Sequence, residues 1–287
     1  MITRRSQPTL GKDPLDILRI AVFAAHAPDW VVPSETLNLM GERVAAGVID
    51  TLEPERAWAE LSRGLMSERP SRMLGVLRQC GALARLLPEV DALFGVPQSA
   101  DDPPQVDVGV HQLRLIDEIA RIKVPLATRW AALLHKLGKA GSPREFWPGH
   151  YGHEARGEPL VRAVCERFKV SAECRDLALL VLRECDRVRR AVDMRAAAIA
   201  ALLDQVEALR HAERFEQLLA VCTCDYLAYP GHEIGDYPKA ERLRRAFKAF
   251  ASVDAATASR TEIGAELFER RAQAIAEALQ SERWTYP

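Results

Sequence analysis

The segment "PSRMLGVLRQCGALARLL", residues 70–87, carries the pattern that decides the fold of this chain. Its apolar side chains recur at spacings of three and four residues, which places them along one face of a helix. Pro70 and Ser71 stand at its start, where helices favour these residues. The stretch therefore predicts an amphipathic helix whose apolar face packs against other parts of the protein.

The same periodicity covers most of the 287 residues. It recurs in three earlier segments, residues 13–27, 33–49 and 54–66. No sustained alternation of apolar and polar residues bounded by turn pairs occurs, so strands are not expected. We predict an all-α, elongated protein of about a dozen helices, with no sheet larger than a stray pair of strands.

Composition limits the classes of function. The chain is 48% hydrophobic and 28% charged, as soluble globular proteins are, and its net charge of −1 gives no general attraction to nucleic acid. Six cysteines without a C-x-x-C pair predict buried, reduced thiols. The sequence shows no secretory leader and no long uncharged apolar run, so we expect a cytoplasmic protein without membrane contact.

Histidines occur in a suggestive order along the middle of the chain. His111, His135, His150 and His153 are followed by Asp186 on a later predicted helix. Imidazoles and carboxylates from several helices of a bundle commonly hold a catalytic divalent ion. A single histidine at a helix end is more often a hydrogen-bonded core residue. The ordered set favours a metal site, present or former, with His111, His135 and Asp186 as its ligands.

The order His, His-Asp, His, Asp is similar to that of the HD phosphohydrolase superfamily, but "LLHKLGK" (133–139) places Lys136 where the second Asp would bind metal. At about 4 Å and an effective dielectric of about 20, a lysine repels a divalent ion by roughly 8 kcal/mol. Cys185 also stands where that superfamily has a histidine before Asp186. We therefore predict a decayed site in which the Lys136 ammonium replaces the ion, with Asp186 as its expected partner.

The resemblance extends beyond the histidines. From residue 13 to about residue 272 the chain resembles the post-head part of a bacterial tRNA CCA-adding nucleotidyltransferase with an HD domain. The most specific segments are "LRQCGALARLLPEVDALFGVP" (77–97) and "WPGHYGHE" (147–154). The resemblance implies a neck and body region over 1–98, a degenerate HD-like domain over 99–228 and a basic helical tail over 229–287.

That family carries a nucleotidyltransferase head, with metal-binding carboxylates spaced Asp-x-Asp, which would precede residue 1. The 287 residues contain no Asp-x-Asp, so we do not expect this chain alone to add nucleotides. The family's nucleotide-selecting neck motif is degenerate here as Asp13, Asp16 and Arg19, because Asp16 replaces an arginine. An alternative for Asp13 is a helix N-cap before Pro14.

The predicted tail contains a basic segment, "KAERLRRAFKAF" (239–250). Phosphate recognition needs several cations on one helix face. The candidate RNA-binding residues are Lys239, Arg242, Arg244, Arg245 and Lys248. An ordinary solvated helix face remains the alternative.

Three functions compete. The first is a headless, nucleotidyltransferase-like pseudoenzyme that binds tRNA or another structured RNA. The second is an active HD phosphohydrolase, a 2′-phosphatase or 2′,3′-cyclic phosphodiesterase using His111, His135, His150, His153 and Asp186. The third is a subunit that works in trans with a separate head. No cofactor is expected unless the HD site is active, when it would take Mg, Mn or Ni, and no DNA partner is expected.

Overall fold

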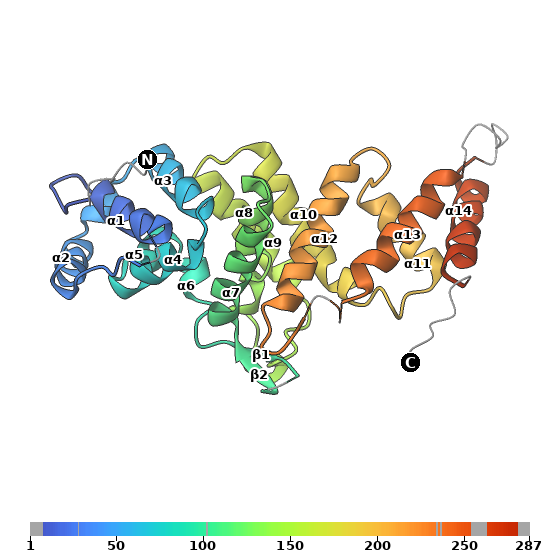
Figure 1. The fold of residues 1–287 in the computed structure, drawn as a ribbon, viewed down its shortest axis with the longest axis horizontal. Coiled ribbons are helices and arrows are strands. Elements are labelled where there is room, and N and C mark those ends of the chain that lie inside the picture. The colour runs from blue at the N-terminus through green and yellow to red at the C-terminus, as the bar shows by residue number, and fades with distance from the viewer. Residues whose placement is uncertain are drawn as a thin grey trace. The chain divides into compact units, whose positions relative to one another are not determined.

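The computed structural model describes residues 8–27, 29–101, 103–233, 235, 237–253 and 263–280. This part of the chain is mostly helical (Figure 1), which confirms the all-α prediction. The chain forms two compact units: unit 1 comprises residues 1–183 and 227–232, and unit 2 comprises 184–226 and 233–287. The three-part division predicted from the sequence stays a prediction, and residues 254–262 and 281–287 of its tail lie outside the described residues.

The elements of unit 1, in chain order, are α1 (Leu15–His26), α2 (Ser34–Ala45), η1 (Val48–Thr51), α3 (Pro54–Leu65), α4 (Pro70–Gln79), α5 (Ala82–Leu86), α6 (Pro88–Asp91), β1 (Pro97–Ser99), β2 (Gln105–Asp107), α7 (Val108–Arg121), α8 (Leu126–Leu134), η2 (Leu137–Lys139), η3 (Arg144–Phe146), α9 (His153–Arg167) and the first part of α10 (Ala172–Arg189). Those of unit 2 are the end of α10, α11 (Ala196–Gln205), α12 (Ala212–Leu227), α13 (Lys239–Ser252) and α14 (Ile263–Gln280).

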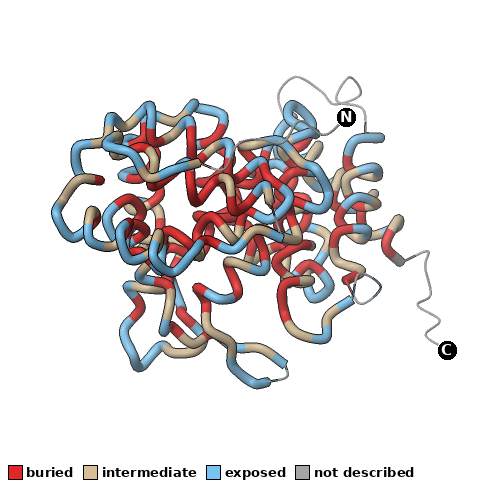
Figure 2. The backbone as a smooth tube through the Cα atoms, turned by 60° about the vertical axis from the view of Figure 1, so that its left-hand side comes forward, coloured by how far each residue is buried: buried red, intermediate tan, exposed pale blue. Residues whose placement is uncertain are grey.

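Helix α1 is the central element of the N-terminal part of unit 1. It packs against α3 and α4, and most of its side chains are buried. In Figure 2, buried residues gather in the interior and exposed ones lie on the outer turns of the tube. At its start, the Asp13 carboxylate accepts a hydrogen bond of 3.0 Å from the Leu15 backbone N–H, which agrees with the predicted capping role.

The segment 70–87 does not form the single helix that its periodicity predicts. Helix α4 ends at Gln79, and Gly81 adopts φ +77° before α5 begins at Ala82. A left-handed residue ends an α-helix, and glycine adopts that conformation without steric cost. The apolar spacing continues across the break because both short helices face the same core.

The predicted join at residues 95–109 contains the two strands that the structure describes. Strands β1 and β2 pair antiparallel, with Gln98 opposite Val106. This agrees with the prediction of no sheet larger than a stray pair; the position of the pair was not predicted, because three-residue strands are too short to show a period of two. The Asp107 carboxylate then caps α7 by accepting from the Val110 N–H at 2.8 Å.

Arg129, in the first turns of α8, joins the N-terminal helices of unit 1 to α7 and α8. Its guanidinium is buried and donates to the carbonyl oxygens of Leu65 and Ser67, both at 2.8 Å, and of Ala120 and Val124, both at 3.3 Å. These carbonyls follow or end α3 and α7, where unpaired oxygens and the helix dipoles attract a cation. Burial lowers the pKa of Arg129.

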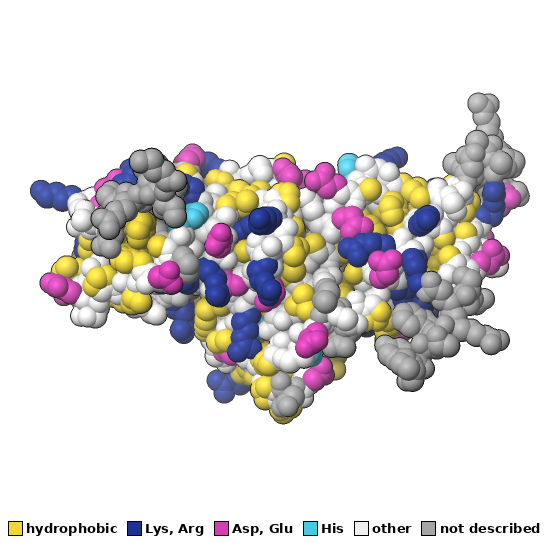
Figure 3. Space-filling model, viewed as in Figure 1, with side chains coloured by type: hydrophobic (Ala, Val, Ile, Leu, Met, Phe, Trp, Pro, Cys, Tyr) yellow, Lys and Arg dark blue, Asp and Glu magenta, His cyan; other side chains and the backbone are white. Residues whose placement is uncertain are grey.

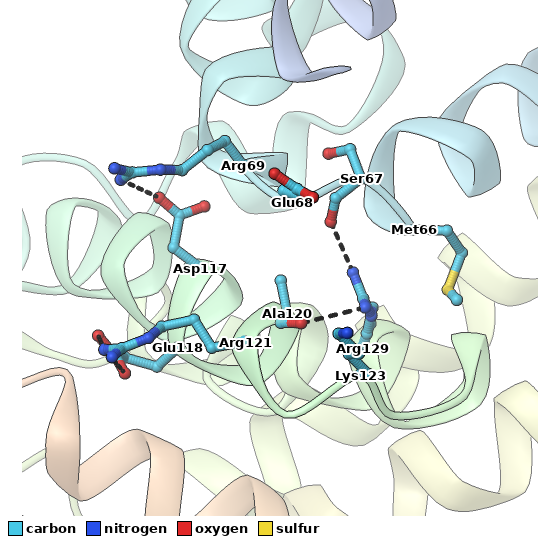
Figure 4. Close-up of a pocket in the computed structure, with 10 residues that line it drawn as sticks. All are labelled: Met66, Ser67, Glu68, Arg69, Asp117, Glu118, Ala120, Arg121, Lys123 and Arg129. Atoms are coloured by element: carbon cyan, nitrogen blue, oxygen red, sulfur yellow. Dashed lines mark hydrogen bonds and ion pairs between the residues drawn. The ribbon is translucent and has the colours of Figure 1, made fainter. Parts of the chain in front are cut away.

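A pocket of about 720 Å³ lies beside this contact (Figure 4). Arg129 points from α8 toward Ser67 and Ala120 at its edge, and Arg69 forms an ion pair with Asp117 at 3.6 Å. Its lining residues are Met66, Ser67, Glu68, Arg69, Asp117, Glu118, Ala120, Arg121, Lys123 and Arg129.

Unit 2 is built from α11, α13 and α14, which pack against one another. Phe250 of α13 is fully buried, and the Arg271 guanidinium lies 4.4 Å from the centre of its ring. The Phe215 and Phe247 rings are 5.3 Å apart and join α12 to α13. Phe215 and Phe250 therefore lie in the core of the unit, and the half-buried Phe247 lies at its edge.

Charges of both signs are mixed over the face drawn in Figure 3, in keeping with the net charge of −1. All six cysteines are buried, as predicted. Among the described residues, no helix has both the length and the apolar character needed to cross a membrane.

Replacing Arg129 should weaken unit 1 strongly. In Arg129→Met, buried carbonyls at the ends of α3 and α7 lose their donor, and we expect the free energy of unfolding to fall by roughly 3 kcal/mol. Arg121→Met removes an exposed cation paired with Glu118 nearby, and should cost less than about 1 kcal/mol. Urea unfolding of both variants measures the difference. Equal midpoints would show that Arg129 does not hold these helices together.

Candidate functional site

The predicted histidines of unit 1 come from three helices and one loop. His111 lies on the buried face of α7, His135 directly follows α8, and His153 begins α9. His150 lies in the loop before α9 and is fully buried. All four imidazoles are therefore inside unit 1, as a metal site or a polar core would require.

A close contact between backbones fixes η2 against α9. A Cβ atom on Gly138 would lie 1.8 Å from the carbonyl oxygen of His153 and 2.6 Å from the backbone nitrogen of Gly157. Only glycine fits at this approach. The Gly138 of "HKLGK" therefore has a packing role: it lets the residues after His135 lie directly against the start of α9.

The His135 ring is oriented by its own helix. Its Nδ1 lies 2.9 Å from the carbonyl oxygen of Ala132, and an Nδ1–H donating there leaves Nε2 as the basic nitrogen. This is the tautomer that a metal-binding histidine needs. The geometry of His135 alone thus remains suitable for a ligand.

Lys136 occupies the position of the missing carboxylate and is 2% exposed. Its Nζ lies 3.5 Å from Gln98 Oε1, and the buried Lys139 Nζ lies 2.9 Å from the same oxygen. The Lys136 ammonium also lies 5.6 Å from the centre of the Tyr229 ring. Two ammonium groups thus approach the same amide oxygen. One of them stands at the sequence position where the HD superfamily has a metal-binding carboxylate.

Sequence reasoning missed several residues of this cluster. Tyr229 packs against His111 with ring centres 4.3 Å apart, and against His232 at 5.4 Å. His232 Nε2 lies 2.9 Å from an Asp101 carboxylate oxygen. The "YPGH" sequence around residue 230 combines an aromatic ring with a histidine, and it could have indicated that these residues belong to the cluster. Gln98 lies in a proline-rich stretch that gave none.

The loop before α9 is held by hydrogen bonds. His150 Nε2 donates to the Pro97 carbonyl oxygen at 2.7 Å, and the Arg156 guanidinium donates to Ser142 Oγ at 2.9 Å and to the Tyr151 carbonyl oxygen at 2.8 Å. Burial lowers the pKa of His150, which outweighs the opposite effect of the hydrogen bond to Pro97. His150 is therefore a buried, neutral support of the loop.

Asp186 lies in unit 2. One of its carboxylate oxygens lies 3.3 Å from the Arg189 guanidinium, one helical turn away on α10. The Cys185 thiol lies 3.3 Å from that of Cys222 on α12, and burial raises the pKa of Cys222. The predicted contact between Lys136 and Asp186 stays a prediction.

The donor set in unit 1 combines histidine rings with buried lysine side chains. Histidine rings are good ligands, but the doublet position presents the Lys136 ammonium, with that of Lys139 nearby, and like charges repel a cation strongly. The chemistry available here is that of hydrogen-bond donors and a buried positive charge.

The degenerate neck motif forms a charge network at the start of α1. The Arg19 guanidinium lies 3.0 Å from Asp16, 3.5 Å from Asp13 and 3.8 Å from Glu60. The hydrogen bond from the Leu15 N–H is the main reason why the pKa of Asp13 is lowered, and Arg56 adds to it. Arg19 also lines a pocket of about 310 Å³ with Phe23 and His26.

The basic residues of α13 differ in accessibility. Arg242 is part-buried and donates to the Ala191 carbonyl oxygen at 3.1 Å, and burial lowers its pKa. The Lys239 ammonium lies 5.3 Å from the centre of the Tyr237 ring. Arg245 is half-buried on the same helix. Arg244, paired with Glu216 at 2.9 Å, and Lys248 are exposed, so these two present cations to solvent.

Comparison with known proteins gives these observations a context. A family model described as "Probable RNA and SrmB- binding site of polymerase A" matches residues 34–94, and an HD-domain model matches residues 108–229. The multifunctional CCA protein of Cupriavidus taiwanensis is 48% identical over 96% of this chain and 68% of its own length. That of Burkholderia cenocepacia is 50% identical over 97% of this chain and 69% of its own length.

The fold and the two matched segments define the class: a helical RNA-binding region followed by an HD domain. At this level of identity and coverage, the chain belongs to the multifunctional CCA protein family. It spans about two thirds of the length of these relatives. The resemblance read from the sequence is confirmed.

The pKa of His150 makes the stability of unit 1 depend on pH. Because the folded protein holds this ring neutral, the unfolded chain takes up its proton at a higher pH than the folded chain, so stability falls as the pH drops below about 6.5. In His150→Gln, an amide N–H can replace the donor to Pro97, and the fall between about pH 6.5 and 5 should be shallower. Urea midpoints measured across this range test the prediction. Identical slopes for both proteins would contradict it.

Proposed function

We propose that this chain binds tRNA or another structured RNA, and that its HD site has lost metal-dependent hydrolysis. Membership of the multifunctional CCA protein family, with a match to an RNA-binding model over 34–94, is the observation that carries the first part. RNA helices are recognised largely through shape and phosphate contacts, which spread over a wide surface. Exposed cations on helices are suited to such contacts.

The proposed phosphate-binding surface includes the exposed side chains of α13, Arg244 and Lys248. Lys239 and Arg242 also position that helix, because the Arg242 guanidinium donates a hydrogen bond to the Ala191 carbonyl oxygen and the Lys239 ammonium lies over the Tyr237 ring. The half-buried Arg245 adds charge. The contribution of α13 to RNA binding is thus electrostatic. It should depend on salt and little on base sequence.

The loss of hydrolysis is supported by Lys136. A metal-activated water needs a bound ion, and the buried Lys136 ammonium replaces a negative ligand by a positive charge. The Gln98 side-chain oxygen and the Tyr229 ring lie close to this ammonium and stabilise its charge. The ammonium thus takes the place of a metal. His111, His135, His150, His153 and Asp186 are then remnants of the site.

We also propose that the neck motif does not select nucleotides. The Arg19 guanidinium faces three carboxylates, those of Asp13, Asp16 and Glu60, which compete for the donors that a base edge would need. The network stabilises the start of α1 instead.

Charge reversal on α13 tests RNA binding. Arg244→Glu with Lys248→Glu should weaken binding of bulk tRNA and of unrelated structured RNAs alike, and should lower the slope of log affinity against log salt by about one to two. Arg210→Glu reverses an exposed cation elsewhere in unit 2 and is the matched control. Filter binding at several salt concentrations provides the measurement. If the double variant binds like the control, α13 is not the contact surface.

Restoring the carboxylate tests the decayed site. Lys136→Asp should let the protein retain Mn²⁺ or Ni²⁺ after dialysis, whereas the wild type should retain much less than one ion per chain. Lys139→Asp makes the same change of charge three residues further on, and should not restore binding. Elemental analysis gives the metal content directly. One ion per wild-type chain, with phosphohydrolase activity abolished by a chelator, would refute the proposal.

A further inference from the structure

The loop between η2 and α9 exposes an unusual group of aromatic side chains. Phe146 is 39% exposed and Tyr151 is 76% exposed, and their rings meet edge to face with centres 6.3 Å apart. Trp147 lies between them in sequence and is half-buried. Residues 142–151 include no Val, Leu, Ile or Met, so aromatic rings and prolines make up the apolar side chains of this segment.

The backbone beneath these rings is fixed. The His150 N–H donates to the Phe146 carbonyl oxygen at 2.7 Å, and the Trp147 indole N–H donates to that of Ser142 at 3.1 Å. The Arg156 guanidinium donates a hydrogen bond to the Tyr151 carbonyl oxygen, and His150 Nε2 donates one to the carbonyl oxygen of Pro97 in β1. The rings are therefore presented by a pre-organised loop, and a ligand that uses them does not have to order it.

The Tyr151 ring lies over Gly149. A Cβ atom at Gly149 would be 3.3 Å from the edge of that ring. A larger residue at this position would therefore crowd the Tyr151 ring. The side chain is largely exposed, so much of the ring is open to solvent. A flat exposed face of this kind can accept a planar ligand.

A cation lies beside the aromatic group. The exposed Arg144 guanidinium is 5.8 Å from the centre of the Trp147 ring. Unpaired bases stack on aromatic rings while nearby cations contact the adjoining phosphates. Aromatic residues and arginine are also common at protein interfaces, so the rings alone do not identify the ligand. Membership of a family with an RNA-binding region, together with the stacking face and the cation, favours a nucleic-acid ligand here.

We infer that Tyr151 and Phe146, with Arg144, form a stacking platform for an unpaired base of bound RNA. This inference rests on the proposed function, since it names a contact made by the same RNA. It also gives the loop a use that does not depend on metal chemistry. Stacking depends little on base identity, so the platform selects unpaired over paired nucleotides and not a particular sequence.

The test measures how two Tyr151 variants bind a fluorescein-labelled decamer of adenylate and bulk tRNA. Tyr151→Leu keeps an apolar side chain but removes the ring, and should weaken binding of the decamer about tenfold, with its salt slope unchanged. Tyr151→Phe keeps the ring and should bind within about twofold of the wild type. A blunt RNA duplex should be bound equally by all three proteins. Tyr151 is exposed, so thermal melting should show that both variants fold normally.

The outcomes separate this inference from the proposed function. If the wild type binds neither RNA, both are wrong. If the wild type binds and loses affinity on charge reversal in α13, but Tyr151→Leu binds like the wild type, only the platform is wrong. Equal losses for Tyr151→Leu and Tyr151→Phe would point to the hydroxyl and would also overturn stacking.

Discussion

The contact between Arg129 and the ends of α3 and α7 holds unit 1 together. It links the segment matched by the RNA-binding model to the segment matched by the HD domain, because Leu65 lies in the first and Arg129 in the second. A cation is suited to this place, since the carbonyl oxygens at two helix ends need donors and carry the negative ends of the helix dipoles. The angle between α7 and α8 is fixed by the same contact. The positions of His111 and His135 therefore depend on an arginine that has no part in the proposed chemistry.

A second constraint keeps the region around Lys136 ordered, whether or not it binds a metal. Gly138 brings η2 against the start of α9, so Lys136 and Lys139 remain enclosed near His153 whatever they bind. A buried ammonium needs acceptors, and Gln98 Oε1 and the Tyr229 ring provide them. The histidines serve the packing as well: His111 lies against Tyr229, and His150 joins the loop to β1. Loss of a metal would then remove a function without removing the core.

The helices were predictable because their apolar spacing reflects burial, and α1 and α3 lie where that spacing places them. Local backbone choices were not: the periodicity of 70–87 gave no sign of the break at Gly81, and two three-residue strands carry too little pattern. At the site, the spacing of the histidines identified groups that unit 1 does bury. It could not reveal Gln98, which reaches Lys139 from 41 positions away. Such long-range polar contacts depend on the tertiary fold and leave no local signal.

Metal catalysis and RNA binding differ in how many residues they need. A divalent ion requires every ligand of a small set, so one change from carboxylate to ammonium at Lys136 opposes the whole site. RNA binding sums many weak contacts, to phosphates through cations such as Lys248 and to bases through rings such as Tyr151. Each of these contacts can be lost with a limited decrease in affinity. Under the proposed function, the chain keeps a surface for RNA without a metal site. The exposed aromatic loop beside His150 would then hold part of the proposed site and part of the proposed surface in one segment of backbone.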